Sequence, residues 1–202
     1  MAERSTGVFG SAFNPPHLAH LIFLAEARWQ LGLDEIFVVP TGDPYHKDSD
    51  SDPGPETRLR LARAAFEGID GVEVSDTEVQ RDGPSYTCDT LEEIADPFGK
   101  YETHFLMGAD AAMSFAGWKQ PERILEMARI GIAPRPGIER DEVQAVFDGL
   151  GGGDRIDFVE MPRVDISSTL IRERIKAKEP FRHLVPTKVG QMIENEDTYG
   201  TE

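Results

Sequence analysis

The stretch FGSAFNPPHLAH, residues 9–20, joins an apolar run to a segment of helical period, and it predicts a strand, a turn and a helix. Gly10 and the small Ser11 allow the turn to approach a ligand closely, because they carry little or no side chain. Pro15 and Pro16 stiffen the entry to the helix. The turn that follows a strand of this kind is where open α/β sheets bind ligands.

The rest of the chain repeats this alternation of short apolar runs with segments of helical period. The strands are predicted at residues 7–10, 35–40, 72–75, 103–108, 129–133 and 156–160. The helices are predicted at residues 17–31, 56–66, 87–95, 122–128, 140–147, 168–177 and 187–194. This pattern indicates an α/β fold: a doubly wound, Rossmann-like and mostly parallel sheet with helices on both faces.

Three local segments add detail to this outline. In the helix predicted at residues 17–31, an apolar stripe follows the i, i+3, i+4, i+7 rule and is expected to face the core. The members of the stripe are Leu18, Leu21, Ile22, Ala25 and Trp29. Residues 41–55, with four aspartates, three prolines and two glycines, predict a long mobile loop. Residues 149–153, which are rich in glycine, predict a flexible connection.

Length and composition restrict the class of protein. The chain has 202 residues, with 21 Lys and Arg against 37 Asp and Glu, and its net charge is −16. We expect a single domain over residues 1–202 and no bulk binding to nucleic acid or anionic membranes, which depends on clustered cations. The lone Cys88 and the lack of a run of about 18 apolar residues favour a cytoplasmic protein. The composition does not indicate an oligomeric state.

His17 and His20 lie three residues apart at the start of the first predicted helix, so both imidazoles can face one ligand. The free N–H groups and the positive dipole end of a helix favour a phosphate there. Three alternatives stay open. The pair could bind zinc, although its spacing is shorter than His-Glu-x-x-His. His20 could be a hydrogen-bonded core residue, or the segment could be only a turn and a helix start.

A second candidate segment, residues 165–172, follows the last predicted strand and opens a helix. Its hydroxyl residues, Ser168 and Thr169 among them, come one turn before Arg172, whose planar guanidinium suits phosphate oxygens. The segment lies within residues 154–188, which carry eight basic side chains against six acidic ones. The alternative is a serine N-cap beside a surface arginine. Two helix starts of this kind on one parallel sheet favour a shared anion site.

The two segments carry a family resemblance. Residues 9–20 resemble the Gly-x-Phe-Asp-Pro-x-His-x-Gly-His signature of the nucleotidyltransferase superfamily, and residues 166–172, ISSTLIR, resemble its Ile-Ser-Ser-Thr-x-x-Arg signature. Intermediate segments occur in the order found in bacterial nicotinate-nucleotide adenylyltransferases. They are PTGDPYHK at 40–47, GPSYTCDTL at 83–91, MGAD at 107–110 with Trp118, and RPG at 135–137. The resemblance covers nearly the whole chain.

The resemblance implies adenylyl transfer from ATP to nicotinate mononucleotide in NAD biosynthesis, with Mg²⁺ held mainly by the ATP phosphates and by no metal-ligating residue. The implied catalytic residues are His17, His20 and Arg172. The implied ATP-binding residues are Gly10, Ser11, Phe13, Gly108, Asp110, Ser168 and Thr169. The implied mononucleotide-binding residues are Lys47, Tyr86, Thr87 and Trp118. The expected partners are these small molecules, not nucleic acid or membrane.

Departures from the family pattern leave alternatives open. The chain has Asn14 where the family shows aspartate, Ser11 and Ala12 where it shows Gly-Thr, and Ala19 between the histidines where it shows glycine. Asn14 removes a negative charge near the phosphates and can still hydrogen-bond. One rival is the same fold acting on nicotinamide mononucleotide or another phosphorylated acceptor. The other is a nucleotide-binding protein with impaired catalysis.

Overall fold

The computed structural model describes residues 5–44, 51–94 and 102–200. Its main sheet has six parallel strands in the order β4-β2-β1-β6-β7-β8. The strands are β1 (Ser5–Ser11), β2 (Glu35–Pro40), β4 (Val72–Val74), β6 (Glu102–Gly108), β7 (Arg129–Ala133) and β8 (Ile156–Phe158). Each predicted strand is confirmed, with its ends shifted by at most two residues. The order reverses at β1, between β2 and β6, and open α/β sheets bind their ligands beyond the carboxyl ends of the strands at such a switch point.

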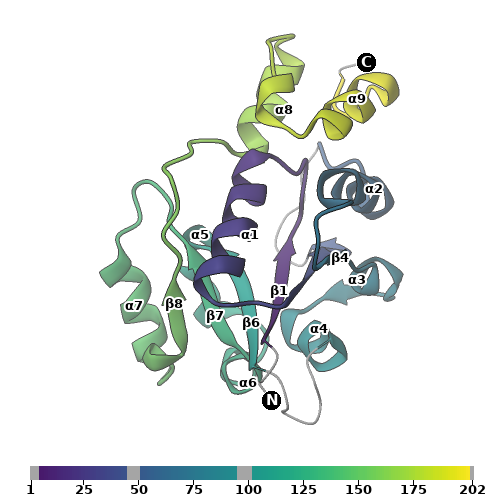
Figure 1. The fold of residues 1–202 in the computed structure, drawn as a ribbon. Helices are drawn as coiled ribbons and strands as arrows, with labels where there is room; N and C mark the ends of the chain where they lie inside the picture. The colour runs from purple at the N-terminus through teal and green to yellow at the C-terminus, as the bar shows by residue number, and fades with distance from the viewer. Residues whose placement is uncertain (1–4, 45–50, 95–101, 201–202) are drawn as a thin grey trace.

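Helices cover both faces of the sheet, as predicted (Figure 1). They are α1 (Leu18–Gln30), α2 (Pro55–Phe66), α3 (Thr77–Gln80), α4 (Thr87–Ile94), α5 (Ala109–Ala112), α6 (Pro121–Met127), α7 (Arg140–Gly149), α8 (Ser168–Lys176) and α9 (Thr187–Glu196). Short 3-10 turns occur at η1 (Phe115–Gly117), η2 (Gly153–Arg155) and η3 (Arg182–Leu184). The sequence did not predict α3 and α5, because a four-residue helix is too short to show a periodic pattern.

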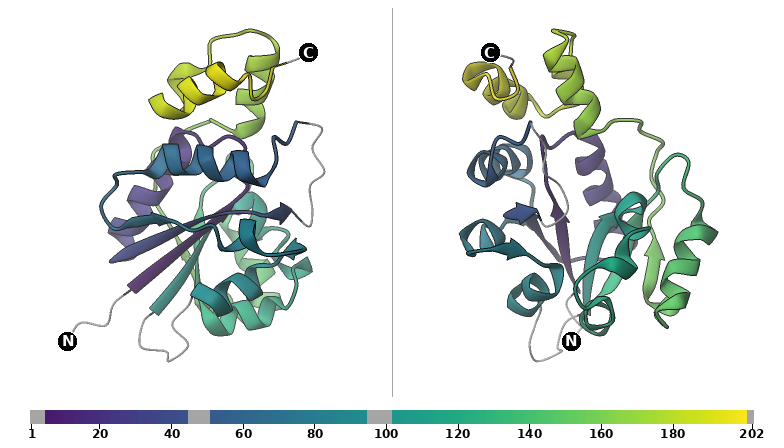
Figure 2. Two further views of the ribbon diagram at one scale, coloured as in Figure 1. Left: turned by 90° about the vertical axis from the view of Figure 1, so that its right-hand side faces the viewer. Right: turned by 180° about the vertical axis from the view of Figure 1, so that it is seen from behind.

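Two apolar clusters form the core, one on each face of the sheet. The first joins β1 and β2 to helices α1, α2 and α9, with Phe9, Phe23 and Phe66 among its members. The second joins β6 and β7 to helices α4 to α7, with Phe115 and Phe147 in stacked contact at 4.8 Å between ring centroids. Helices α8 and α9 lie beyond the carboxyl ends of the strands, as Figure 2 shows from two further directions.

The predicted core stripe of α1 is correct only in part, because Leu21 packs against the core but two other members face the solvent. Trp29 is 79% exposed and Ala25 is also exposed, whereas the buried residues are Phe23, Leu24 and Ala27. The segment LAHLIFLAEARW is apolar on more than one face, so its periodicity alone did not select the side that packs on the sheet. The aromatic contact of Phe23 with Phe9 of β1, at 5.3 Å between centroids, fixes the observed orientation.

The segment predicted as one long loop, residues 41–55, contains structure that was not predicted. Asp43–Pro44 forms a short strand, β3, which pairs in parallel with β5 (Pro84–Ser85) in a second sheet. Residues 45–50 of this loop lie outside the described residues, and α2 begins at Pro55. The break predicted at 149–153 is also shorter, because α7 extends to Gly149 and η2 begins at Gly153. In the part of the chain that the structure describes, no helix is long and apolar enough to cross a membrane.

The corrected orientation of α1 can be tested by unfolding experiments. Leu24→Ala should lower the free energy of unfolding by about 2–5 kcal/mol, because it leaves a cavity at a side chain that packs in the core. Trp29→Ala should change it by less than about 0.5 kcal/mol, because the ring is largely in water. Urea unfolding of both variants measures the difference. A larger loss for Trp29→Ala than for Leu24→Ala would contradict this orientation.

Candidate active site

The turn after β1 is held by aromatic packing. Phe13 is buried with φ of 48°, in the left-handed region that a residue other than glycine seldom adopts. Its ring meets the rings of Phe9 and Phe66 edge-on, at 5.3 and 5.4 Å between centroids. A Cβ atom at Gly10 would lie 3.0 Å from the ring of Phe105, which is tighter than ordinary contact. These contacts fold the turn back on itself and bring His17 to the start of α1.

His17 and His20 lie against each other at the first turn of α1. Their rings stack at 3.7 Å between centroids, with an interplanar angle of 24°. The backbone N–H of His17 donates to Nδ1 of His20 at 3.1 Å. Because Nδ1 of the neutral His20 accepts this bond, its proton is on Nε2, and that N–H is the donor left for a ligand. The zinc alternative has no third ligand, since no group of three or more His, Cys, Asp or Glu side chains among the described residues could hold a metal ion.

Both imidazoles are neutral at pH 7 when the site holds no anion. Burial, with the positive charge of Arg135, lowers the pKa of His17 to about 4. Burial also lowers the pKa of His20 well below its usual value, with further contributions from His17 and Arg135. Burial disfavours a positive charge on either ring, and an anion bound beside the stacked rings would offset that effect. The pair therefore offers N–H donors to an anion without requiring a net charge of its own.

The second candidate segment meets the first. Ser167 caps α8 by accepting from the Leu170 N–H at 3.1 Å. The hydroxyl of Ser168 donates to the Pro15 carbonyl at 2.8 Å, so its proton is used to hold the β1 turn. Nη1 of Arg172 donates to the carbonyl oxygen of Asn14 at 2.7 Å. The start of α8 is thus fixed directly to the turn that leads to the histidines, although the two lie more than 150 residues apart in the chain.

Most of the positive charge in residues 154–188 has no part in this site. Arg163, Arg182 and Lys188 pair with carboxylates at the surface, and Arg155 donates to a backbone carbonyl. Within that segment, Arg172 is the cation that contacts the β1 turn. The excess of basic residues in this segment drew attention to α8. The contact of its cations with the β1 turn, however, is made by one side chain, Arg172, and not by the summed charge of the segment.

Arg135 belongs to the RPG motif at residues 135–137, but no role was predicted for it from the sequence. The side chain is exposed in the turn after β7, and its charge acts on both histidines. The buried Oδ1 of Asn14 has no hydrogen-bond partner within the described residues. Both observations add polar groups to the neighbourhood of His17 and His20. The spacing of the RPG motif gave no signal for this, because Arg135 reaches the site from a different strand.

Gly108 and Asp110 lie at the carboxyl end of β6, which pairs with β1 in the register Phe9↔Leu106. A Cβ atom at Gly108 would lie 2.5 Å from Oδ1 of Asp110, so the glycine leaves room for the carboxylate. Asp110 is exposed in the first turn of α5. A small apolar cavity of about 20 Å³ lies nearby, lined in part by Ala109 and Ile132. A volume of this size holds about one water molecule and not a nucleobase.

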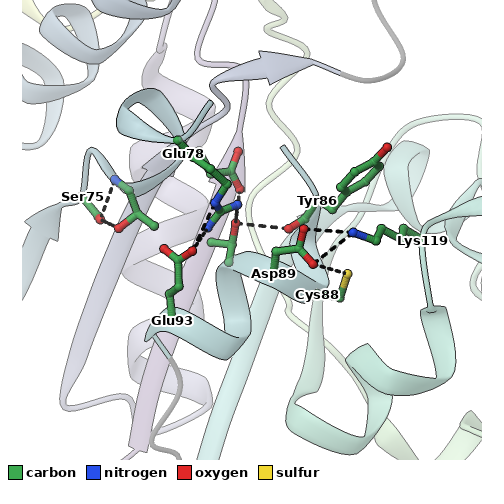
Figure 3. Close-up of polar contacts among 10 residues, drawn as sticks. Ser75, Glu78, Tyr86, Cys88, Asp89, Glu93 and Lys119 are labelled. Carbon is green, nitrogen blue, oxygen red and sulfur yellow. Dashed lines mark hydrogen bonds and ion pairs between the residues drawn. The ribbon is translucent and has the colours of Figure 1, made fainter. Parts of the chain in front are cut away.

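Of the residues predicted for the mononucleotide, Tyr86 and Trp118 pack against the same core cluster as α4. Nζ of Lys119 lies 4.1 Å from the centroid of the Tyr86 ring and also binds both carboxylate oxygens of Asp89 (Figure 3). Trp118 packs against Phe115 at 5.3 Å, and its indole N–H donates to Ser114 at 3.3 Å. Thr87 is the first residue of α4. Lys47 lies outside the described residues.

A buried arginine that was not predicted from the sequence connects the turn after β1 to the loop after β2. Arg58 has no exposed surface, and its guanidinium donates to the carbonyls of Ala12 at 3.3 Å and Gly42 at 2.7 Å, and to that of Thr41. Asp52 balances its charge at 3.0 Å. A signal for this residue existed, since Arg58 occupies one position of an otherwise apolar stripe. The other members of that stripe are Leu61, Ala62, Ala65 and Phe66.

Comparisons with known proteins show which family the sequence and the fold resemble. The sequence model of the cytidylyltransferase-like family matches residues 8–174. A Dehalococcoides mccartyi protein named "Probable nicotinate-nucleotide adenylyltransferase" is 35% identical over 98% of both chains. A protein of the same name from Carboxydothermus hydrogenoformans is 36% identical over 98% of this chain and 100% of its own. The nicotinic acid mononucleotide adenylyltransferase of Plasmodium falciparum, solved with NaAD, has a TM-score of 0.79 at 17% identity, over 97% of both chains.

The pKa values of the histidines give a prediction for the free protein. We expect His17 to gain its proton near pH 4 and His20 at a lower pH than usual, measured by NMR titration of the imidazoles. In the unfolded chain both groups titrate near about 6.5, so below that pH the unfolded state binds more protons. The free energy of unfolding should therefore fall as the pH drops from about 6.5 toward 4. An imidazole at either position that titrates at its usual value would contradict the geometry.

Proposed function

The chain belongs to the cytidylyltransferase-like family and, within it, to the nicotinate-nucleotide adenylyltransferases, and we propose that it transfers the adenylyl group of ATP to nicotinate mononucleotide. The observation that supports this best is the junction of the His17–His20 pair with the start of α8, fixed by the Arg172 bond to Asn14. Hydrogen-bond donors from two helix starts meet there, at the edge of the sheet where a triphosphate would bind.

The reaction needs positioning and charge stabilisation more than acid or base groups. An oxygen of the mononucleotide phosphate is already an anionic nucleophile, and it attacks the α-phosphorus of ATP. The new O–P bond forms as the bond to the bridging oxygen breaks, and pyrophosphate leaves with the electron pair. In this proposal, Nε2–H of His20 and the His17 imidazole donate hydrogen bonds to the phosphates during the transfer. Arg172 and Arg135 balance the charge that develops on the pyrophosphate.

The ATP side is proposed to be the region beyond the carboxyl ends of the paired strands β1 and β6. Gly10, Ser11 and Phe13 form the turn along which the phosphates would lie, and Gly108 and Asp110 line the opposite strand end near the ribose. Thr169 is exposed at the start of α8 and keeps a hydroxyl for a phosphate oxygen. Ser168 contributes through its bond to Pro15, which fixes the turn.

The acceptor side is proposed to be the group formed by Tyr86, Thr87 and Trp118, together with Lys47, which follows β3 in the sequence. The Trp118 ring can stack on a pyridine ring, and the donors at the start of α4 can bind its carboxylate. Because Lys119 beside Tyr86 is paired with Asp89, the preference for the carboxylate of nicotinate over the neutral amide of nicotinamide is proposed to come from the N–H donors at the start of α4.

The metal that fits this site is one that arrives with ATP. Because the polar groups near the histidines are cations and N–H donors, the described residues offer no cluster of acidic ligands for an ion of their own. Mg²⁺ commonly keeps several waters and binds substrate phosphates, so Mg–ATP is the proposed substrate. Bound in this form, the ion would supply positive charge that offsets the charge of the phosphates.

Parallel assays distinguish the acceptors. Purified protein with ATP and Mg²⁺ should release pyrophosphate with nicotinate mononucleotide at a kcat/KM at least tenfold above that with nicotinamide mononucleotide, a difference of about 1.4 kcal/mol. Release with the nicotinamide form and not with the nicotinate form would overturn the proposed acceptor. ATP binding without release for either form would instead indicate a nucleotide-binding protein with impaired catalysis.

The role of the histidines can be tested by substitution. His20→Ala should lower kcat by about 10²–10³-fold, because it removes a donor that acts on developing phosphate charge. His183→Ala is the matched control, since His183 is exposed in η3, and it should retain wild-type turnover. Steady-state pyrophosphate release measures both. Full-speed turnover by a folded His20→Ala protein would exclude a catalytic role for this imidazole.

A further inference from the structure

Glu78 is a buried acid that the proposed reaction does not use. It lies on the short helix α3, and 7% of its surface is exposed. Burial raises the pKa of its carboxyl group, while hydrogen bonds from Thr90, the Gly42 backbone and Ser85 oppose the rise. The Thr90 hydroxyl donates to Oε1 at 2.7 Å. A carboxyl group with this many donors from other segments is a junction between them.

The donors come from three separate parts of the chain. Gly42 belongs to the loop after β2, Ser85 to strand β5, and Thr90 to helix α4. The Gly42 segment packs tightly on α3, because a Cβ atom at Gly42 would lie 2.0 Å from the Glu78 carbonyl oxygen. The Asp43 N–H also donates to Oγ of Ser85 at 3.3 Å, beside the β3–β5 pair. Glu78 therefore lies at the point where the small second sheet joins α4.

The same contacts continue to the acceptor side of the site. The backbone N–H of Thr90 donates to the Tyr86 carbonyl at 3.1 Å, and the Thr90 hydroxyl oxygen lies 3.3 Å from that carbonyl. Arg81 donates to the same hydroxyl oxygen at 3.2 Å. Figure 3 shows these contacts around Tyr86, with Glu78 on the α3 side and the Lys119–Asp89 pair on the other. A shift of the Glu78 carboxyl would thus be passed to Tyr86 through one side chain.

We propose that Glu78 is a positioning residue for the acceptor: its carboxylate holds Gly42, Ser85 and Thr90 together and so sets the place of Tyr86 and Thr87. This inference rests on the proposed function, because it concerns the mononucleotide side of that reaction. The ATP side is held by other contacts, namely the bonds of Ser168 and Arg172 to the β1 turn. Glu78 should therefore affect the two substrates unequally.

Steady-state kinetics of Glu78→Gln in the full chain tests this inequality. The amide keeps the size of the side chain. Its N–H groups, however, would face the donors that bind the carboxylate in the wild type. KM for nicotinate mononucleotide should rise by about tenfold, equivalent to about 1.4 kcal/mol, while KM for ATP stays within about twofold. A general folding defect would instead lower kcat and leave both KM values in place. Unchanged KM for the mononucleotide, or an equal rise for both substrates, would overturn the proposal.

Two further variants complete the experiment. Glu92→Gln makes the same change on an exposed face of α4, where the residue pairs with Arg123, and both KM values should match the wild type. Thr90→Val removes the bridging hydroxyl with little change of shape, and it decides the matter if Glu78→Gln yields no folded protein. It should raise KM for the mononucleotide by about threefold and leave KM for ATP unchanged. An unchanged KM for the mononucleotide in Thr90→Val would overturn the proposal.

The wild type separates this inference from the proposed function. If it turns over nicotinamide mononucleotide and not the nicotinate form, the proposed acceptor is wrong, and the Glu78 variants are measured with the acceptor that the wild type uses. A rise in KM for that acceptor alone would still support positioning by Glu78. Equal effects on both substrates would overturn it whichever acceptor is used.

Discussion

The guanidinium of Arg58 lies without exposed surface between two loops, and the arrangement of both loops depends on it. It donates to Ala12 in the turn after β1 and to Thr41 and Gly42 in the loop after β2. A buried cation is stable only when every donor finds an acceptor, so this residue constrains both loops at once. The loop after β2 is constrained again by Glu78, which binds the other side of the Gly42 peptide. One glycine thus lies between a buried cation and a buried acid.

The charge of the chain and the chemistry of its site are separate matters. A net charge of −16 describes the whole molecule, much of whose basic content is held in ion pairs at the surface. At the histidines the polarity comes from neutral imidazoles, helix N–H groups and the nearby Arg135 and Arg172. Such a site suits a small anion with a few well-placed oxygens. Binding of a long polyanion depends instead on many cations spread over a surface.

Local pattern predicted the parts of this fold that are locally determined. Short apolar runs bounded by turns gave all the strands of the main sheet, and helical period gave every helix of seven residues or more. The pattern failed where tertiary packing decides. It placed Trp29 of α1 in the core, although this side chain is exposed, and it missed the pairing of β3 with β5. The two end motifs were recognised separately, but no local signal showed that Arg172 would bind the carbonyl of Asn14. The roles of Arg58 and Glu78 were missed because their hydrogen-bond partners come from other segments of the chain.

The bonds between α8 and the β1 turn also bear on how the protein is made. Asn14 and Pro15 precede Ser168 and Arg172 by more than 150 residues, so the β1 turn is synthesised long before α8. The strands of the sheet can pair earlier, because each needs only its neighbours. The junction of the β1 turn with α8, however, can form only after α8 has been synthesised. A chain that stops before α8 would therefore lack the bonds from Ser168 and Arg172 that hold this turn.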